Sequence, residues 1–231
     1  MLKIIYSSEN SVLIKLGNKI DNNMPIIIRS TMDNLQEYFD KNILEIVPSY
    51  CSILIFFKLN YIIYNHKNLF SQIKKVVKNI GTNPKIITDM IKIPVCYDES
   101  LAPDITKISK QNNITIKDII KIHSNKTYQV FAVGFAPAFA YLGVVDEKIA
   151  TARLDAPRTK IPAGSVAIAN NQTAIYPVDS PAGWNIIGRT PIDLSLKKIK
   201  NLTKFNIADR VVFKPISLSE YKIIKKIQNE Q

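Results

Sequence analysis

The chain has 231 residues, of which 46% are hydrophobic and 22% are charged, a composition typical of a soluble globular protein. Its formal net charge is +12, but lysines are scattered through every segment and no recognised nucleic-acid motif accompanies them, so we expect no nucleic-acid partner. No apolar run approaches the roughly 18 residues of a membrane span, and the N-terminus lacks a secretory signal pattern, so we expect a cytoplasmic protein with no membrane partner.

The N-terminal part of the chain alternates strand-like and helix-like patterns. Short β-compatible runs predict strands at residues 2–6, 11–16, 43–47 and 52–59, and helices are predicted at residues 27–41 and 69–80. In the second helix, Leu69, Ile73 and Val76 fall on one face, and Gly81 follows as the expected stop. A further strand is predicted at residues 85–93. We therefore expect residues 1–92 to form a small α+β domain.

The second part of the sequence has a different character. Two short helices are predicted between residues 101 and 125, where Pro103 lies near the start of the first helix. Thr115 followed by Asp118 resembles a capping box at the start of the second helix. Further along, β-branched residues, Gly and Pro dominate, and strands are predicted at residues 128–133, 165–169, 173–176, 185–187 and 210–213. We expect residues 93–231 to form a compact β-barrel or sandwich with functional loops.

Residues 131–191 concentrate positions with special backbone geometry. They hold five of the seven glycines, half of the twelve prolines and the only tryptophan, Trp184. They also hold Arg153, Arg158 and Arg189, three of the five arginines in the chain. A guanidinium offers a rigid fork of donors that an ammonium does not copy. We therefore interpret these three positions as selected for geometry rather than for charge.

Familiar catalytic signatures are missing from the sequence. It has no glycine-rich phosphate loop, no paired histidines for zinc and no nucleophile elbow. Cys51 and Cys96 lack metal-ligand spacing, so no metal site is predicted. His123 ends an amphipathic helix and suits general acid or base catalysis near neutral pH. An equally supported alternative is that His123 caps that helix, because the helix dipole favours a cation at its C-terminal end.

Several polar and aromatic side chains accompany the arginines. Arg153 and Arg158 flank one loop, where two guanidiniums could clamp a carboxylate or phosphate oxygen. The alternative is that they form ion pairs with nearby acidic residues: Asp146, Glu147 or Asp155. Gln172 offers a donor and an acceptor, Tyr176 a hydroxyl and Trp184 a flat wall. Each of these three residues alone is more often structural.

Four ordered motifs make the chain similar to a known family. They are HS at 123–124, GFAPAFAYLG at 134–143, APRTKIPAGSVAIANNQTAIYP at 156–177 and SPAGWNIIGRTP at 180–191. The chain resembles the family of the 5-oxoprolinase B subunit, also described as allophanate hydrolase subunit 1 and as Kip-type inhibitors of a sporulation histidine kinase. The resemblance is strongest over residues 93–213. It implies a small α+β N-terminal domain followed by a mainly-β, cyclophilin-like barrel.

The same resemblance implies that the chain works in a complex. In the 5-oxoprolinase system, the B subunit acts with the A and C subunits to open the lactam of 5-oxo-L-proline, giving L-glutamate at the expense of ATP. Because a lactam carbonyl is a poor electrophile, we expect ATP to activate its oxygen as a phosphate ester before water attacks. The resemblance thus implies a small anionic amide substrate, ATP bound in a partner subunit or at an interface, and a subunit that is inactive alone.

On this resemblance we assign roles to the matching residues. His123 is expected to move the proton, while Arg153 and Arg158 stabilise the developing negative charge. The expected substrate-binding residues are Gln172, Tyr176, Trp184 and Arg189.

Several positions depart from the family pattern GFxPGFPYLG and from its later motifs. Ala138 and Ala140 stand where relatives have a glycine and a proline, and Ala174 and Ala182 are further departures. Loss of glycine is expected to close off backbone geometry with positive φ, which weakens the catalytic interpretation. Two alternatives are a regulatory inhibitor of a sensor histidine kinase and an allophanate hydrolase-like amide hydrolase subunit. A prolyl isomerase is suggested by fold analogy alone.

Overall fold

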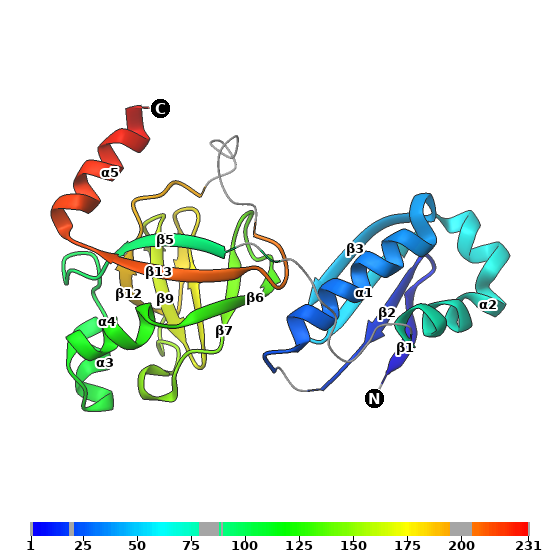
Figure 1. Ribbon diagram of the computed structural model, residues 1–231, viewed down its shortest axis with the longest axis horizontal. Coiled ribbons are helices and arrows are strands. Elements are labelled where there is room, and N and C mark those ends of the chain that lie inside the picture. The colour runs from blue at the N-terminus through cyan, green and yellow to red at the C-terminus, as the bar shows by residue number, and fades with distance from the viewer. Residues whose placement is uncertain (1, 19–20, 79–87, 89, 195–204, 231) are drawn as a thin grey trace. The chain divides into compact units, whose positions relative to one another are not determined.

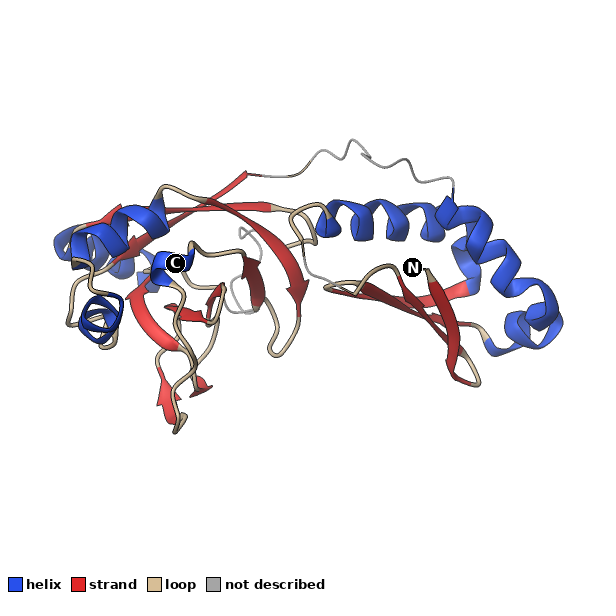
Figure 2. Cartoon of the chain, turned by 90° about the horizontal axis from the view of Figure 1, so that it is seen from below, coloured by secondary structure: helices blue, strands red, loops and turns tan. Residues whose placement is uncertain are grey.

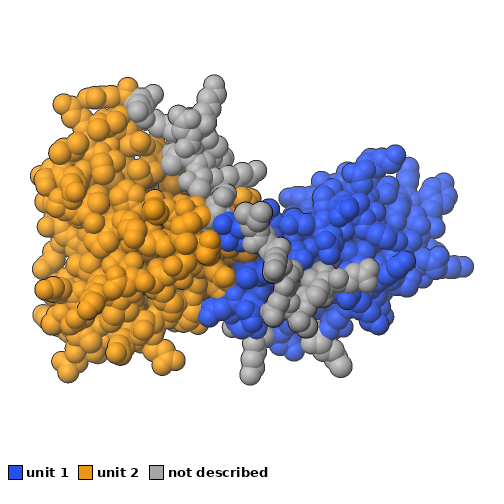
Figure 3. All heavy atoms as spheres, in the orientation of Figure 1, with its two compact units in different colours: residues 1–88 blue, residues 89–231 orange. Residues whose placement is uncertain are grey.

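The computed structural model describes residues 2–18, 21–78, 88, 90–194 and 205–230. The chain divides into two compact units, which Figure 3 distinguishes by colour: unit 1 is Met1–Thr88 and unit 2 is Asp89–Gln231. In the described part of the chain, no helix is both long enough and apolar enough to cross a membrane.

Unit 1 contains a four-stranded antiparallel sheet and two α-helices. The strands β1 (Lys3–Ser8), β2 (Ser11–Lys15), β3 (Ile43–Ser49) and β4 (Ser52–Phe57) lie in the order β1-β2-β4-β3. Helix α1 (Met24–Phe39) is followed by the short turn η1 (Asp40–Asn42) and packs on β3 and β4. Helix α2 (Leu59–Lys78) packs on α1. Figure 2 shows the helices of unit 1 on one side of its sheet.

Alternating apolar residues explain why this sheet buries one face. On β2, Val12 and Ile14 are fully buried, and Ile14 lies opposite the fully buried Ile53 of β4 in the antiparallel register. Phe39, the last residue of α1, packs edge to face on Phe57 of β4, with ring centroids 5.2 Å apart. The apolar stripe of α1 therefore covers the apolar face of the sheet.

The predicted elements of unit 1 are present with shifted bounds. The structure contains the four predicted strands and the first predicted helix. The second helix is longer than predicted, because it begins at Leu59 and its buried stripe starts at Ile62, two turns before Leu69. Tyr64, in this early part, is a large hydrophobic residue that is 86% exposed. Because it lies off the buried stripe, it obscures the helical period in the sequence. The expected stop at Gly81 and residues 85–87 and 89 of the strand predicted at residues 85–93 lie outside the described residues.

Within the described residues, unit 2 contains a closed barrel of seven strands, which confirms the predicted barrel (Figure 1). In barrel order the strands are β10 (Gln172–Ile175), β7 (Ala140–Gly143), β6 (Thr127–Val133), β13 (Arg210–Ile216), β5 (Met90–Cys96), β12 (Asn185–Arg189) and β9 (Ser165–Ala169). Strands β5 and β13 pair in parallel, and the other neighbours pair in antiparallel fashion. A closed barrel leaves no strand edge unpaired.

The predicted domain boundary, between residues 92 and 93, falls within strand β5. This strand begins at Met90 and belongs to the barrel of unit 2. Its residues pair with Arg210–Ile216 of β13, and Ile91 and Ile93 are buried. The end of the strand predicted at residues 85–93 therefore belongs to the barrel.

The two helices predicted between residues 101 and 125 are α3 (Ile105–Asn112) and α4 (Ile116–Ser124). The predicted capping box is confirmed, because the Thr115 hydroxyl accepts a hydrogen bond from the backbone N–H of Asp118 at 3.1 Å. Helix α3 packs on β12 and α4 packs on β13. The remaining elements are a two-stranded sheet of β8 (Arg158–Ile161) and β11 (Ser180–Ala182), the turn η2 (Glu147–Ile149) and helix α5 (Leu218–Glu230).

Candidate functional site

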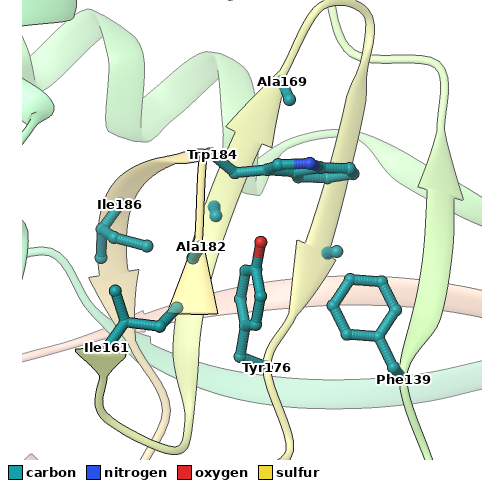
Figure 4. Close-up of a cluster of buried hydrophobic side chains, with 9 residues drawn as sticks. Phe139, Ile161, Ala169, Tyr176, Ala182, Trp184 and Ile186 are labelled. Carbon is teal, nitrogen blue, oxygen red and sulfur yellow. The ribbon is translucent and has the colours of Figure 1, made fainter. Parts of the chain in front are cut away.

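The segment rich in Gly, Pro and Arg forms strands β7 to β12 and their loops. Four of its aromatic side chains pack together as an aromatic cluster, namely Phe139, Tyr141, Tyr176 and Trp184. The ring centroids of Phe139 and Tyr176 lie 5.1 Å apart, and those of Tyr141 and Trp184 lie 6.1 Å apart. In Figure 4 the hydroxyl of Tyr176 points toward the Trp184 ring, and Phe139 lies beside Tyr176.

Small side chains allow the aromatic cluster to pack against the strands. Ala167 and Ala169 of β9, Ala174 of β10 and Ala182 of β11 belong to the same buried group as the aromatic rings. A larger side chain at these positions would compete with the rings for space. Two departures from the family pattern, Ala174 and Ala182, therefore lie at the candidate site.

Arg153 places an accessible guanidinium at the aromatic cluster. Its Cζ atom lies 5.8 Å from the centroid of the Trp184 ring, within cation–π range. Arg153 is exposed and has no salt bridge among the described residues. Burial raises the pKa of Tyr176 to about 12, although the charge of Arg153 acts in the opposite direction. Tyr176 therefore keeps its proton at neutral pH and presents an O–H donor near a cation.

Arg158 is held by an acidic residue that the sequence did not suggest. Its Nη1 and Nη2 atoms donate to the two carboxylate oxygens of Asp104 at 2.9 and 2.7 Å. Asp104 is 4% exposed, and its Oδ2 also accepts a hydrogen bond from the backbone N–H of Ile186 at 2.7 Å. Arg158 thus forms an ion pair, as the alternative interpretation expected, but its partner is not one of the three acidic residues considered there.

Arg189 lines the same pocket as Arg158. Its Nε atom donates to the backbone oxygen of Ala163 at 2.9 Å. The pocket that the two arginines line lies in unit 2 and has a volume of about 180 Å³. Ile161 and Ile186 line this pocket and also belong to the buried group around the aromatic rings. The pocket and the aromatic cluster are therefore neighbours that share a wall.

His123 is fully buried and connects α4 to the barrel through both ring nitrogens. The hydroxyl of Thr173 donates its single proton to the backbone oxygen of Ala167 at 2.9 Å, so it accepts from His123 Nε2 at 3.0 Å. The Nδ1 atom of the neutral ring then accepts from the hydroxyl of Tyr97 at 2.7 Å. The ring also stacks on Phe213 of β13, with centroids 4.5 Å apart. These contacts identify the neutral tautomer that carries its proton on Nε2.

Burial lowers the pKa of His123 to about 3, so the ring is uncharged near neutral pH. The helix-cap alternative required a charged imidazolium and is wrong, because the side chain instead bonds Tyr97 and Thr173. A catalytic role for His123 stays a prediction.

Gln172 opens β10, where it lies opposite Gly143 of β7 and Ala169 of β9 in the strand register. Its side chain is partly buried. Among the described residues, no group of three or more His, Cys, Asp or Glu side chains is placed to hold a metal ion.

The seven predicted site residues fall into distinct places. The structure brings Arg153, Tyr176 and Trp184 together at the aromatic cluster. It places Arg158 and Arg189 in the neighbouring pocket. Of the other two residues, His123 lies in the core and Gln172 lies at the start of β10.

Three residues of this region were missed from the sequence. Phe139 and Tyr141 are two residues apart around the start of β7, a spacing that puts two strand side chains on one face. Asp104 follows Pro103 just before α3, where an acidic residue favours the helix dipole. Nothing in the sequence links Asp104 to Arg158, which lies 54 residues further along the chain.

Ala138 keeps the backbone geometry that a glycine would adopt. Its φ angle is +64°, in the left-handed region. The expectation that loss of glycine closes off this geometry is therefore wrong at Ala138, because the loop adopts it with an alanine at a steric cost. Asn170, in the turn between β9 and β10, has a φ of +52°, which asparagine tolerates better.

A family model described as "Carboxyltransferase domain, subdomain C and D" matches residues 2–201 of the chain. The chain belongs to this family. It is also 31% identical over 230 residues to a Bacillus subtilis (strain 168) protein named as the B subunit of 5-oxoprolinase, and the match covers 96% of this chain and 95% of that protein. The family resemblance carried by the sequence motifs is thereby confirmed.

Solved structures in the comparison share the fold. The conserved uncharacterized protein PH0987 from Pyrococcus horikoshii is 34% identical with a TM-score of 0.55, and the match covers 95% of this chain and 100% of that one. The protein TTHA0988 is 22% identical with a TM-score of 0.75, and the match covers 90% of this chain. This carboxyltransferase-family chain corresponds to 40% of the TTHA0988 chain, so in that protein the fold is part of a longer polypeptide.

Proposed function

We propose that this chain is the B subunit of an ATP-dependent 5-oxoprolinase, which helps the A and C subunits to hydrolyse 5-oxo-L-proline to L-glutamate in the cytoplasm. The observation that carries the proposal is the similarity to the Bacillus subtilis protein named as the B subunit of 5-oxoprolinase, which extends over 95% of that protein. TTHA0988 supports work in a larger assembly, because a single chain there joins this fold to further sequence.

The chemistry of the aromatic cluster suits this substrate. 5-Oxo-L-proline is a small ring that carries one carboxylate and one lactam carbonyl. The accessible guanidinium of Arg153 offers a fork for the carboxylate, and the Trp184 ring beneath it offers a flat wall. Tyr176 retains its O–H, a donor suited to the lactam oxygen. We therefore assign substrate binding to Arg153, Tyr176 and Trp184.

ATP makes the lactam reactive in this proposal. Transfer of the terminal phosphoryl group of ATP to the lactam oxygen releases ADP and gives a phosphate ester. One water then adds to the former carbonyl carbon, and cleavage of the C–N bond opens the ring to an acyl phosphate. A second water hydrolyses the acyl phosphate, which releases phosphate and L-glutamate. Positive charge from Arg153 stabilises the negative charge that develops on the oxygens. We assign ATP itself to a partner subunit or to an interface, and this subunit is expected to be inactive alone.

The roles that the family resemblance implies for His123, in proton transfer, and for Gln172, in substrate binding, stay part of the proposal. His123 donates to Thr173, the residue that follows Gln172 on β10, so a change at His123 is transmitted to this strand. The finer description of the fold, an α+β domain over residues 1–92 and a cyclophilin-like barrel over residues 93–231, is also part of the proposal and rests on the family resemblance.

Release of L-glutamate from 5-oxo-L-proline tests the proposal. The chain is mixed with ATP and with the A and C subunits from its own genome, and each protein is omitted in turn. We expect release only when all three subunits are present. A folded, assembled complex that releases no glutamate would contradict the proposal and favour the alternative, a protein that docks against a sensor histidine kinase and inhibits it.

The Arg153→Gln variant tests the assignment of the substrate site within the active complex. Loss of a charge-assisted hydrogen bond is worth about 1.5–3 kcal/mol, so we expect the KM for 5-oxo-L-proline to rise by roughly 10- to 100-fold. Arg210→Gln is the matched control, because Arg210 is an exposed arginine of β13. Equal KM values for the two variants would remove Arg153 from the substrate site.

A further inference from the structure

We propose that the pocket lined by Arg158 and Arg189 is a binding site for a compact oxyanion, either phosphate or a small carboxylate. This oxyanion pocket lies in unit 2 and is distinct from the aromatic cluster, although the two share a wall. Its lining comes from the loop before α3, from β8 and the turn after it, and from the strands β9 and β12. Segments far apart in the sequence therefore converge on one small cavity.

The charge of the lining favours an anion. Arg158, Lys160 and Arg189 line the pocket, and none of its lining residues is Asp or Glu. Asp104 lies behind Arg158 and is 4% exposed. Two further acidic side chains contact lining residues from outside the lining: Asp98 accepts from the backbone N–H and hydroxyl of Ser100, and Asp179 pairs with Lys160 at 3.0 Å. The side chains of Asp179 and Lys160 are at least half exposed, so water screens this pair. Arg189 has no salt bridge among the described residues.

The two guanidiniums are fixed in place while most of their donors remain available. Arg158 uses two of its five N–H groups on the carboxylate of Asp104. Arg189 uses its Nε–H on the backbone oxygen of Ala163, and its four terminal N–H groups make no hydrogen bond with the described residues. Because both side chains are already anchored, an arriving anion has little side-chain entropy to remove. Asp104 is thus a positioning residue of the oxyanion pocket.

The size of the pocket limits the ligand. Its volume of about 180 Å³ is well above the ~10–15 Å³ that holds a single water molecule. This space suits a phosphate ion or a carboxylate on a small molecule. It is below the ~300–1,000 Å³ of pockets that hold drug-sized ligands, so a nucleotide does not fit inside it. Apolar side chains of Leu101, Ile161 and Ile186 form part of the wall and strengthen the attraction between the cations and an anion.

Calorimetric titration of the intact chain with inorganic phosphate tests this site, at an ionic strength held constant with sodium chloride. We expect saturable binding of one phosphate per chain. Arg189→Gln is expected to weaken that affinity by about tenfold or more. Lys160→Gln changes an exposed side chain, so it leaves the fold intact and is expected to weaken binding by a smaller factor. Arg210→Gln, the same change on β13, is expected to leave binding unaltered.

The proposal would be overturned if the chain showed no saturable phosphate binding, or if chloride abolished the binding at equal ionic strength. Equal affinities for Arg189→Gln, Lys160→Gln and Arg210→Gln would also overturn it. Competition then distinguishes the two sources of the oxyanion. Displacement of phosphate by acetate identifies a carboxylate site, whereas retention of phosphate against acetate identifies a phosphate site. Because the chain is titrated without the A and C subunits and without ATP, a failure here is separate from a failure of the glutamate-release assay.

Discussion

At Ala138, in the loop between β6 and β7, the backbone has a φ of +64° although the residue is not glycine. An alanine in this region costs roughly 1–2 kcal/mol, because its Cβ atom approaches the following carbonyl oxygen. Glycine removes this clash but adds about 0.4–1 kcal/mol of chain entropy to the unfolded state. We therefore expect Ala138→Gly to raise the free energy of unfolding by about 0.5–1 kcal/mol, measured by chemical denaturation.

Ala140→Gly is the matched control for Ala138→Gly. Ala140 is the first residue of β7, is 2% exposed and does not have a positive φ. Glycine at such a position lowers stability by roughly 0.5–1 kcal/mol. The two substitutions are thus expected to move the denaturation midpoint in opposite directions, and a shift in the same direction would refute the strain at Ala138.

The buried imidazole of His123 makes stability depend on pH. Its pKa is about 3 in the folded protein, against about 6.5 when unfolded, so between these values the unfolded chain binds more protons. The stabilisation is complete above pH 6.5 and is lost as the pH falls toward 3. By pH 4.5 we expect the free energy of unfolding to have dropped by about 2–3 kcal/mol through this residue, as measured by urea denaturation at each pH.

His123→Gln isolates this contribution. Glutamine offers an N–H and a carbonyl oxygen in place of the two ring nitrogens and does not titrate. The variant is expected to be less stable at pH 7 but to lose the drop in stability between pH 7 and 4.5. A pH dependence equal to that of the unsubstituted chain would mean that groups other than His123 cause it.

At the scale of elements, the pair of Asp104 and Arg158 ties α3 to β8 and β12. The carboxylate of Asp104 receives both terminal nitrogens of Arg158 and the backbone N–H of Ile186. Removal of one partner of a fully buried pair costs about 3–5 kcal/mol, but Arg158 is one-third exposed. We therefore expect Asp104→Asn to lower the free energy of unfolding by about 2–3 kcal/mol in chemical denaturation.

The exposed pair of Arg29 and Asp33 on α1 supplies the comparison for this prediction. Its side chains are 30% and 57% exposed, so Asp33→Asn is expected to cost less than 1 kcal/mol. Arg158→Lys is expected to resemble Asp104→Asn, because an ammonium does not reproduce the bidentate fork. Equal stability of the Asp104 and Asp33 variants would show that the first pair does not hold α3 in place.

The sequence predicted the elements whose periodicity was strong. Strand β9 was predicted with its observed bounds, since its five residues are all buried in the barrel and mostly apolar. Strands β7, β8 and β11 were missed, because each has only three or four residues. Helix α5 was missed as well; Ile223 and Ile227 on it are largely exposed, which leaves its apolar stripe indistinct.

Over the whole molecule, the sequence predicted where the candidate site lies better than how its residues are paired. The concentration of Gly, Pro, Arg and the single Trp in residues 131–191 led to the prediction of a functional segment there. This segment does contain the aromatic cluster with Arg153. The partner of Arg158 and the burial of His123 depend on contacts between segments 50 or more residues apart. Such contacts arise when segments far apart in the sequence pack together, which local periodicity does not describe.

The division of the chain into units is tested by cutting it at two neighbouring points. A fragment of residues 89–231 retains all of β5, whereas a fragment of residues 93–231 begins at the predicted boundary and lacks the first part of that strand. The missing residues pair with Arg210, Val211 and Val212 of β13, and they include Ile91, which is 5% exposed. Loss of one buried isoleucine and its ladder hydrogen bonds is worth about 2–4 kcal/mol, so the shorter fragment is expected to melt at a lower temperature.

Circular dichroism during heating of the two fragments measures this difference. We expect a cooperative transition for residues 89–231, because the closed barrel, the aromatic cluster and the oxyanion pocket all lie within this unit. Phosphate is expected to raise the melting temperature of this fragment and that of the full chain alike, since a ligand stabilises the state that binds it. Equal melting temperatures for the two fragments would mean that the start of β5 contributes nothing to the barrel, and that the boundary belongs after residue 92.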